Sequence, residues 1–264
     1  AGEFYADLLA RRVFAPLGMQ TARLIDELAV VPNRAAGYEL RDGHLRNAEW
    51  VSPTANSTAD GSLYLSLLDY ARWEAGLFGR KVLKPESWAQ ISRPARLANG
   101  GSYPYGLGWF LERGADQDIW RHSGEWQGFK TFIIRYLGDE LTLVALANSD
   151  SGDPERIVRH VAGLLDPKLA QPPGAPIEDR EPRVTDLLET LLQQISDGNA
   201  DYEDFAFISK QDFADLMSAW QRTLKSLGSL REIALFAREE LAGDQVYRYR
   251  ARYETGLLEV KLGY

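Results

Sequence analysis

The stretch Trp120–Thr131, WRHSGEWQGFKT, places His122, Ser123 and Gly124 in one tripeptide just before an apolar run. Three strands are predicted around it, over residues 118–123, 129–136 and 141–147. The last of them, LTLVALA, is apolar throughout, which is typical of a strand that is covered on both faces. The stretch is therefore expected in an antiparallel sheet flanked by helices, a mixed α/β fold.

Towards the N-terminus the pattern changes from helix to hairpin. Residues 3–14, EFYADLLARRVF, place apolar side chains near one helical face, and Pro16 and Gly18 follow as stop signals. The segment YELRDGHLRN predicts a hairpin, because Asp42-Gly43 supplies the positive φ angles of a tight turn. Helical and extended segments thus both precede the predicted sheet.

Two further helices are predicted, one before and one after the sheet. Residues 66–79, SLLDYARWEAGLFG, open with the capping-box pattern of Ser66 and Asp69. The second helix starts at Asp153-Pro154, a favoured pair for a helix N-terminus, and runs through Leu165. It carries one apolar stripe, made of Ile157, Val161, Leu164 and Leu165.

A second, smaller domain is predicted after a linker. Residues 167–182 hold five prolines and no periodicity, which is typical of a linker. Residues 183–264 then show two amphipathic helices followed by alternating strands, a small α+β domain. Its arginines Arg248, Arg250 and Arg252 alternate with three tyrosines and Ala251. A solvated sheet face paired with acidic neighbours is favoured over an anion-binding row.

Composition limits the classes of partner. The 264 residues carry a net charge of −8, which argues against nucleic acid as a partner and against anionic lipid surfaces. The chain has no Cys, so disulfides, thiolate catalysis and thiolate metal sites are excluded. No apolar run reaches the ~18 residues that span a bilayer, and we expect no signal peptide within these 264 residues. Because the first residue is Ala, we expect a chain that was processed or cut from a longer one.

The tripeptide itself allows two interpretations. Neighbouring side chains on a strand point to opposite faces, so a Ser123–His122 dyad is geometrically poor. In the functional interpretation, His122 faces a substrate, Gly124 allows close backbone approach, and the N–H of Glu125 points at a developing oxyanion. The alternative is a structural His that is hydrogen-bonded at the end of a strand.

The order of several blocks resembles the serine β-lactamase and penicillin-binding-protein superfamily, in its class C, esterase and D-aminopeptidase branch. The blocks are FYADLLARRVFAPLGMQTA, AAGYEL, NSTADGSLYLSLLDYARW, YGLGWFL, HSGEWQGFKTFIIRY and LTLVALANSD, and they cover residues 1–166. The third motif of that family is Lys-Thr-Gly or His-x-Gly, on the strand that borders the cleft. His122, Ser123 and Gly124 match His-x-Gly. The resemblance implies that His122 binds substrate or polarises the site, and that the Glu125 N–H is an oxyanion-hole donor.

Two motifs of the family are absent from the chain. The nucleophile of the family lies in Ser-x-x-Lys and its second motif is Tyr-x-Asn, and neither pattern occurs in the sequence. Both motifs precede the block that starts here at Phe14, so the chain resembles a member that begins partway through its catalytic domain. We therefore expect a serine hydrolase that lacks its nucleophile here and is inactive alone. The alternative is a non-catalytic binding or scaffold protein with the same fold.

Other constellations are weaker. His44, His122 and His160 are scattered, so neither a metal site nor a cofactor is expected. Trp126 is a candidate substrate-binding residue together with Ser123, and Trp109 and Trp120 line a pocket near the strand or pack in the core. Residues 183–264 resemble cystatin-like or nuclear-transport-factor-like accessory domains, which implies an accessory role or homo-oligomer formation. The expected substrate is a small ester, amide or peptide, and the resemblance favours a periplasmic or secreted location.

Overall fold

The computed structural model describes residues 2–26, 28–41, 43–48, 59, 61–114, 116–170, 176–206, 208–241 and 243–263. The chain divides into two compact units. The first comprises residues 1–95 and 104–171, and the second comprises residues 96–103 and 172–264. Each unit has its own hydrophobic core.

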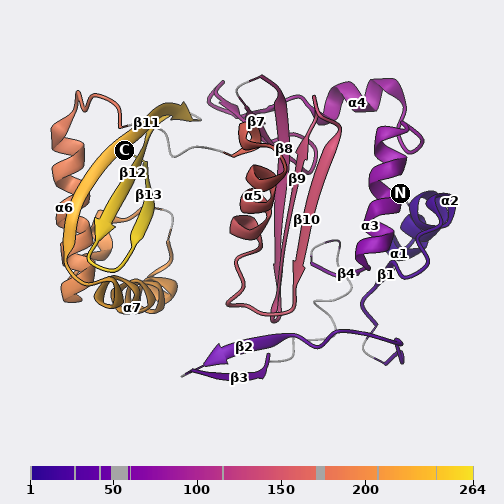
Figure 1. The fold of residues 1–264 in the computed structure, drawn as a ribbon, viewed down its shortest axis with the longest axis horizontal. Coiled ribbons are helices and arrows are strands. Elements are labelled where there is room, and N and C mark those ends of the chain that lie inside the picture. Colours follow the sequence, from indigo (N-terminus) through magenta and orange to yellow (C-terminus); the bar gives the residue numbers. More distant parts are fainter. Residues whose placement is uncertain are drawn as a thin grey trace. The chain divides into compact units, whose positions relative to one another are not determined.

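The first unit is built on a four-stranded antiparallel sheet in the order β10-β9-β8-β7 (Figure 1). Its strands are β7 (Phe110–Arg113), β8 (Asp118–Trp126), β9 (Phe129–Tyr136) and β10 (Leu141–Ala147). The predicted strands 129–136 and 141–147 are confirmed. The strand predicted over 118–123 extends to Trp126, because β8 stays paired with β9 up to the turn at Gln127-Gly128.

Helix α5 (Pro154–Leu165) packs on one face of this sheet and helix α3 (Leu67–Phe78) lies on the other (Figure 1). The predicted helix to Leu165 is confirmed, and Asp153 caps it by accepting a hydrogen bond from the Arg156 N–H. Its buried residues, however, are Pro154, Val158 and Ala162. The predicted apolar stripe is exposed at all four of its residues, Ile157, Val161, Leu164 and Leu165.

A buried ion pair ties α3 to the sheet. Arg135 of β9 donates from Nε to Glu74 of α3 at 2.9 Å, and both side chains are buried. Thr142 and Tyr70 also donate to the Glu74 carboxylate, at 2.8 and 3.0 Å. Burial raises the pKa of Tyr70, as does the neighbouring Glu74, so this phenol stays a donor. The guanidinium lies over three aromatic rings, those of Phe78, Trp109 and Trp120.

The N-terminal helical segment runs through α1 (Tyr5–Leu9), the π-helical turn η1 (Ala10–Phe14) and α2 (Ala15–Leu17). It ends at Gly18, whose φ of 69° is left-handed, whereas Pro16 lies inside the last turn. Asp69 of α3 anchors the chain that follows, since its buried carboxylate accepts hydrogen bonds from Gln20, Thr21, Ala22 and Arg72. Burial raises the pKa of Asp69, but these hydrogen bonds outweigh it and lower the pKa below its ordinary value.

Short elements complete the first unit. The predicted hairpin is confirmed as β2 (Tyr38–Arg41) paired with β3 (His44–Asn47); Gly43 has a φ of 75°, and Asp42 lies outside the described residues. The remaining elements of the first unit are α4 (Pro85–Ile91), η3 (Pro167–Leu169) and the paired strands β1 (Arg23–Leu24) with β4 (Leu63–Tyr64). The short pair of β5 (Ala95–Arg96) with β6 (Ser102–Tyr103) lies mostly in residues 96–103, which belong to the second unit.

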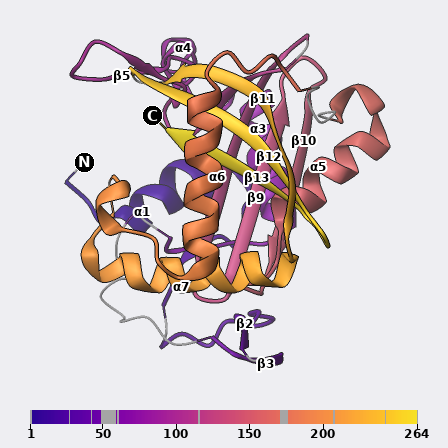
Figure 2. The ribbon, with the colours of Figure 1, turned by 90° about the vertical axis from the view of Figure 1, so that its left-hand side faces the viewer.

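The second unit packs two helices on a three-stranded antiparallel sheet in the order β11-β12-β13. Figure 2 shows α6 in front of these strands. The elements are α6 (Pro182–Asp197), η4 (Tyr202–Asp204), α7 (Lys210–Leu227), β11 (Leu230–Leu241), β12 (Asp244–Tyr253) and β13 (Leu257–Gly263). Tyr247, Tyr249 and Tyr253 of β12 lie in its core. The predicted mixed fold, an antiparallel sheet flanked by helices plus a small α+β part, is confirmed.

The arginine row of β12 is an ion-paired face, as the sequence favours, and it is solvated at Arg248 and Arg252, whereas Arg250 is only 16% exposed. Arg248 pairs with Glu239, Arg250 with Glu259 and Arg252 with Glu232. Each carboxylate comes from a neighbouring strand, β11 or β13. These arginines therefore have local counter-charges and do not form an anion site of their own.

Candidate active site

The candidate site lies where β8 loses a partner on one side. Strand β7 pairs only with Asp118–Arg121, whereas β9 pairs with β8 from Ile119 to Trp126. In the part of the chain that the structure describes, no strand pairs with the outer edge of β8 over residues 122–126. This segment, called the open edge, carries His122, Ser123, Gly124, Glu125 and Trp126. Those of its backbone N–H groups that point away from β9, which no other strand of the described residues pairs with, can bind an extended ligand.

His122 is fixed at both ring nitrogens. Nε2 lies 2.9 Å from the hydroxyl oxygen of Tyr105, and Nδ1 lies 2.5 Å from the backbone carbonyl oxygen of Ser123. The rings of Tyr105 and Phe110 contact the imidazole with centroids 5.9 and 5.8 Å away. The ring is half-buried at the end of the β7 pairing. Its nitrogens are thus engaged by groups other than the Ser123 hydroxyl.

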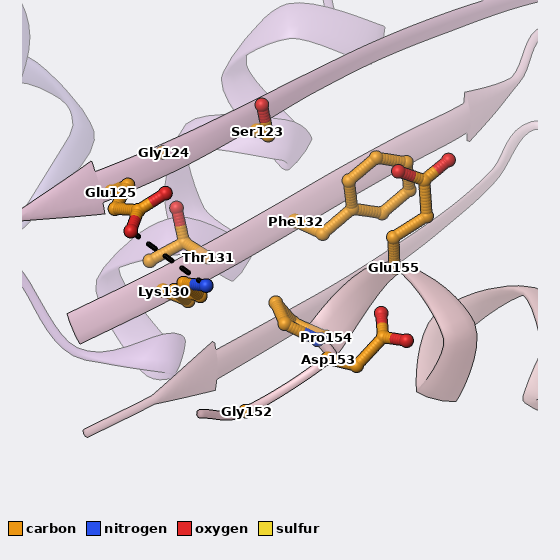
Figure 3. Close-up of a pocket in the computed structure, with 10 residues that line it drawn as sticks. All are labelled: Ser123, Gly124, Glu125, Lys130, Thr131, Phe132, Gly152, Asp153, Pro154 and Glu155. Atoms are coloured by element: carbon orange, nitrogen blue, oxygen red, sulfur yellow. Dashed lines mark ion pairs between the residues drawn. The ribbon is translucent and has the colours of Figure 1, made fainter. Parts of the chain in front are cut away.

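The side chains of Ser123 and Glu125 lie on the face of the sheet opposite to that of His122, as strand alternation requires. They line a pocket of about 350 Å³ with Lys130, Phe132 and the first residues of α5 (Figure 3). Glu125 pairs with Lys130 at 3.6 Å across β8 and β9. The side chains of Ser123 and Glu125 therefore point away from His122, and only their backbone groups share its edge.

The space available for a side chain at position 124 is limited by a neighbouring residue on β9. It pairs with Thr131, and a Cβ atom at Gly124 would lie 2.5 Å from the Thr131 hydroxyl oxygen. This is closer than real Cβ atoms approach, so a side chain at this position would displace Thr131. Glycine is therefore the residue that fits beside Thr131 without displacing it.

The tryptophans divide between edge and core. Trp126 is half-buried under Gly61, where a Cβ atom would lie 2.6 Å from its indole ring. Its indole Nε1 is buried and has no hydrogen-bond partner among the described residues. Trp120 is buried and packs with Trp88 and Trp109 at 6.2 and 6.1 Å. Trp109 and Trp120 therefore belong to core packing, while Trp126 lies at the end of the open edge.

Tyr105 is a site neighbour that the sequence analysis does not single out. It lies in the loop before β7, 17 residues from His122 in the chain. The strand that brings it there, β7, is not among the strands predicted from the sequence. If Phe110 pairs near Arg121, residues just before 110 come beside residues just after 121.

The described residues hold no group of three or more His, Cys, Asp or Glu side chains that are arranged to bind a metal. A search of the same residues for helices long and apolar enough to cross a membrane found none.

Comparison with known proteins defines the class. Residues 1–166 match the family described as Beta-lactamase, and the chain therefore belongs to the β-lactamase family. This confirms the predicted relation to serine hydrolases of the β-lactamase and penicillin-binding-protein type.

Two curated proteins match part of the chain. The chain is 29% identical to penicillin-binding protein 4* of Bacillus subtilis over 163 residues, which are 57% of this chain and 36% of that protein. It is 25% identical to D-aminopeptidase of Brucella ovis over 181 residues, 67% of this chain and 33% of that protein. The chain thus spans about a third of the length of these curated relatives.

A solved structure shares the fold over nearly the whole chain. The octameric penicillin-binding protein homologue from Pyrococcus abyssi aligns with a TM-score of 0.54 and 18% identity. The alignment covers 98% of this chain and 50% of that one, so both units have counterparts in it.

Proposed function

We propose that the first unit forms the sheet side of the active site of a serine hydrolase that cleaves small esters, amides or peptides. The observation that carries the proposal is the open edge of β8, where the His-x-Gly pattern of His122–Gly124 coincides with unpaired backbone. Membership of the β-lactamase family supports it independently.

Strand geometry gives the edge an electrostatic role. Trp126 and Phe129 form the closing pair of the β8–β9 hairpin, and hydrogen-bonded and non-hydrogen-bonded pairs alternate from there. If the closing pair is hydrogen-bonded, Glu125–Lys130 and Ser123–Phe132 are non-hydrogen-bonded pairs. The N–H groups of Ser123 and Glu125 then point away from β9, towards the open edge. The Glu125 N–H is the proposed donor to the oxyanion, and the small Gly124 gives it access.

The nucleophile is proposed to lie in residues that precede Ala1. No serine of the 264 residues has Lys three positions later, and the chain spans about a third of its curated relatives. In the reaction, the serine oxygen bonds to the acyl carbon and the alcohol or amine leaves with a proton. Water then cleaves the acyl-enzyme and returns the proton to the serine. His122 is the proposed substrate-facing residue of the sheet side.

The His-x-Gly form, in place of Lys-Thr-Gly, favours ester or peptide substrates over β-lactams. The name of the Brucella ovis relative, D-aminopeptidase, is consistent with an amide substrate for this chain. The Trp126 ring at the end of the open edge is the proposed apolar contact for such a substrate.

The decisive experiment determines the sequence upstream of Ala1 and tests the full-length protein for a reactive serine. The reading frame upstream of Ala1 should encode Ser-x-x-Lys followed by Tyr-x-Asn, and its full-length product should form a covalent adduct with a fluorophosphonate probe in mass spectrometry. The 264-residue chain alone should form none. An adduct on the short chain would contradict the placement of the nucleophile. A full-length product without the motifs and without an adduct would favour the scaffold alternative.

A substitution at the edge tests the role of His122. In the full-length protein, His122→Ala should lower kcat/KM by at least about tenfold, the equivalent of one lost substrate contact, with little change in Tm. A large loss of Tm with unchanged kcat/KM would favour a structural histidine.

We further propose that residues 183–264 form an accessory domain through which copies of the chain associate. The support is that the Pyrococcus abyssi homologue, described as octameric, aligns with 98% of this chain. Light scattering on the 264-residue chain should show an oligomer, and removal of residues 167–264 should abolish it. A monomer at all concentrations would contradict this role.

A further inference from the structure

The hydrogen-bond partners of His122 assign its tautomer. A backbone carbonyl oxygen only accepts, so Nδ1, which faces the Ser123 carbonyl at 2.5 Å, carries the ring hydrogen. In the neutral imidazole Nε2 is then the acceptor, and the Tyr105 hydroxyl at 2.9 Å donates to it. The neutral ring therefore has no donor or acceptor left over.

Tyr105 is itself rigidly placed. Its carbonyl oxygen accepts from the Ala95 N–H at 2.9 Å, and the next N–H, that of Gly106, donates to Trp109 at 2.8 Å. At Gly106 a Cβ atom would lie 1.8 Å from the carbonyl oxygen of Ile91, so the backbone passes closely against α4. The Tyr105 ring also meets Phe110 edge-on with centroids 4.8 Å apart. These contacts fix the hydroxyl before any ligand arrives.

We propose that Tyr105 is a positioning residue for His122, which locks the imidazole in the Nδ1–H tautomer and orients it at the open edge. The role of this lock in catalysis rests on the proposed function of the edge. A group that must meet a substrate in one orientation gains from such preorganisation, because its supporting hydrogen bonds hold the ring in place.

Tyr105 and Ser123 can keep their hydrogen bonds to His122 whether the imidazole is neutral or protonated. When Nε2 takes up a proton, it becomes a donor and the Tyr105 oxygen becomes its acceptor, while Nδ1–H still donates to Ser123. The hydroxyl hydrogen of Tyr105 is then released to turn towards another acceptor at the edge. Tyr105 and His122 thus act as one unit, in which the proton on the ring sets the direction of the hydroxyl.

The tautomer is tested on the 264-residue chain, which needs no nucleophile. Ring ¹⁵N resonances of the three histidines are recorded by NMR at a pH where imidazoles are neutral. His122 should show one tautomer, with hydrogen on Nδ1, and Tyr105→Phe should shift its Nε2 resonance or admit the second tautomer. His44 and His160, both exposed, should not change. A wild-type His122 with hydrogen on Nε2, or an Nε2 resonance unaffected by Tyr105→Phe, would overturn the proposal.

A matched control removes a nearby hydroxyl. Tyr103 lies two residues away, and in the described structure it makes no hydrogen bond with His122. Tyr103→Phe should leave the His122 resonances unchanged. If both variants shift them equally, the effect is a general loosening of the loop and the positioning role fails.

The catalytic consequence is tested in the full-length enzyme by a double-mutant cycle. Tyr105→Phe should lower kcat/KM about tenfold, the equivalent of one hydrogen bond, and should have no further effect in the His122→Ala background. Additive losses would mean that Tyr105 acts independently of His122. If the full-length protein has no hydrolase activity, the proposed function fails, but the ¹⁵N result still decides the positioning of His122.

Discussion

Strands β8 and β12 are each the paired centre of an antiparallel sheet, yet they differ in how far that pairing extends. Strand β12 pairs with β11 and β13 along nearly its whole length, from Val246 to Arg252 on both sides. Strand β8 has two partners only up to Arg121. The difference separates a closed scaffold from a sheet with backbone left for a ligand.

The ion pairs of the two sheets also differ in how deeply they are buried. In the second unit, the ion pairs of Arg248 and Arg252 lie in solvent on one sheet face. In the first unit, Arg135 and Glu74 are buried between the sheet and α3, with side chains only 2% and 9% exposed. A buried pair must satisfy its hydrogen bonds within the protein, so it fixes geometry in a way that a solvated pair does not. The buried pair thus fixes the position of α3 against the sheet that holds the open edge.

The largest predicted effect breaks the buried pair. Glu74→Ala leaves the Arg135 guanidinium uncompensated among aromatic rings, and Arg135 Nη1 already lacks a hydrogen-bond partner among the described residues. The free energy of unfolding of the first unit should fall by about 3–5 kcal/mol, measured by urea denaturation followed through tryptophan fluorescence. Glu232→Ala, which removes the exposed partner of Arg252, is the matched control. A similar small loss in both variants would contradict the contrast between the sheets.

The second prediction concerns Asp69, whose two oxygens face donors only. Asp69→Asn turns one oxygen into an NH₂ group opposite these donors, so it should cost about 2–3 kcal/mol near pH 7. Because the pKa of Asp69 is lowered on folding from 3.8, its contribution is present above that pH and is lost as pH falls through the lower, folded pKa.

The pH profile supplies the control for Asp69. The difference in Tm between wild type and Asp69→Asn should be constant above about pH 5 and should shrink as pH falls below the unfolded pKa. A difference that stays constant into strong acid would show that the carboxylate charge is not what holds residues 20–22.

Local sequence patterns predicted the helices and strands well, but they predicted the contacts between residues distant in the sequence poorly. The predicted strands 129–136 and 141–147 match β9 and β10 to the residue, and the second of them was recognised by its apolar run. The Tyr105–His122 contact was not predicted, because it depends on where β7 stops pairing. The apolar stripe on α5 gave the helix but not its buried face, since Ala162 and Val158 pack on the sheet instead. A role of this segment at the border of a cleft was one of two interpretations of the tripeptide, and the family resemblance favoured it.

The third prediction sharpens the contrast at one residue, since β8 carries Gly124 and β12 has no glycine. Gly124→Ala should cost about 1–2 kcal/mol, because the new methyl group meets the Thr131 hydroxyl. In a Thr131→Ala background, the nearest remaining atom is Thr131 Cβ at 3.8 Å, an ordinary contact. The cost should then fall below about 0.5 kcal/mol, measured as a double-mutant cycle in urea. An unchanged cost would locate the constraint in the backbone instead.

The smallest effect is expected on the closed sheet. Arg252 and Glu232 are 65% and 51% exposed, so solvent screens their attraction, and Arg252→Ala should change the free energy of unfolding by less than about 1 kcal/mol. Arg250 is the internal contrast, because its side chain is only 16% exposed and lies 4.3 Å from the Phe236 ring centroid. Arg250→Ala should cost more than Arg252→Ala, through lost packing rather than lost charge. Raising the salt concentration should therefore leave that difference in place. If salt removes the difference between the two variants, charge does contribute to the stability of the second sheet. The two sheets would then differ in how deeply their ion pairs are buried, and not in whether those ion pairs stabilise them.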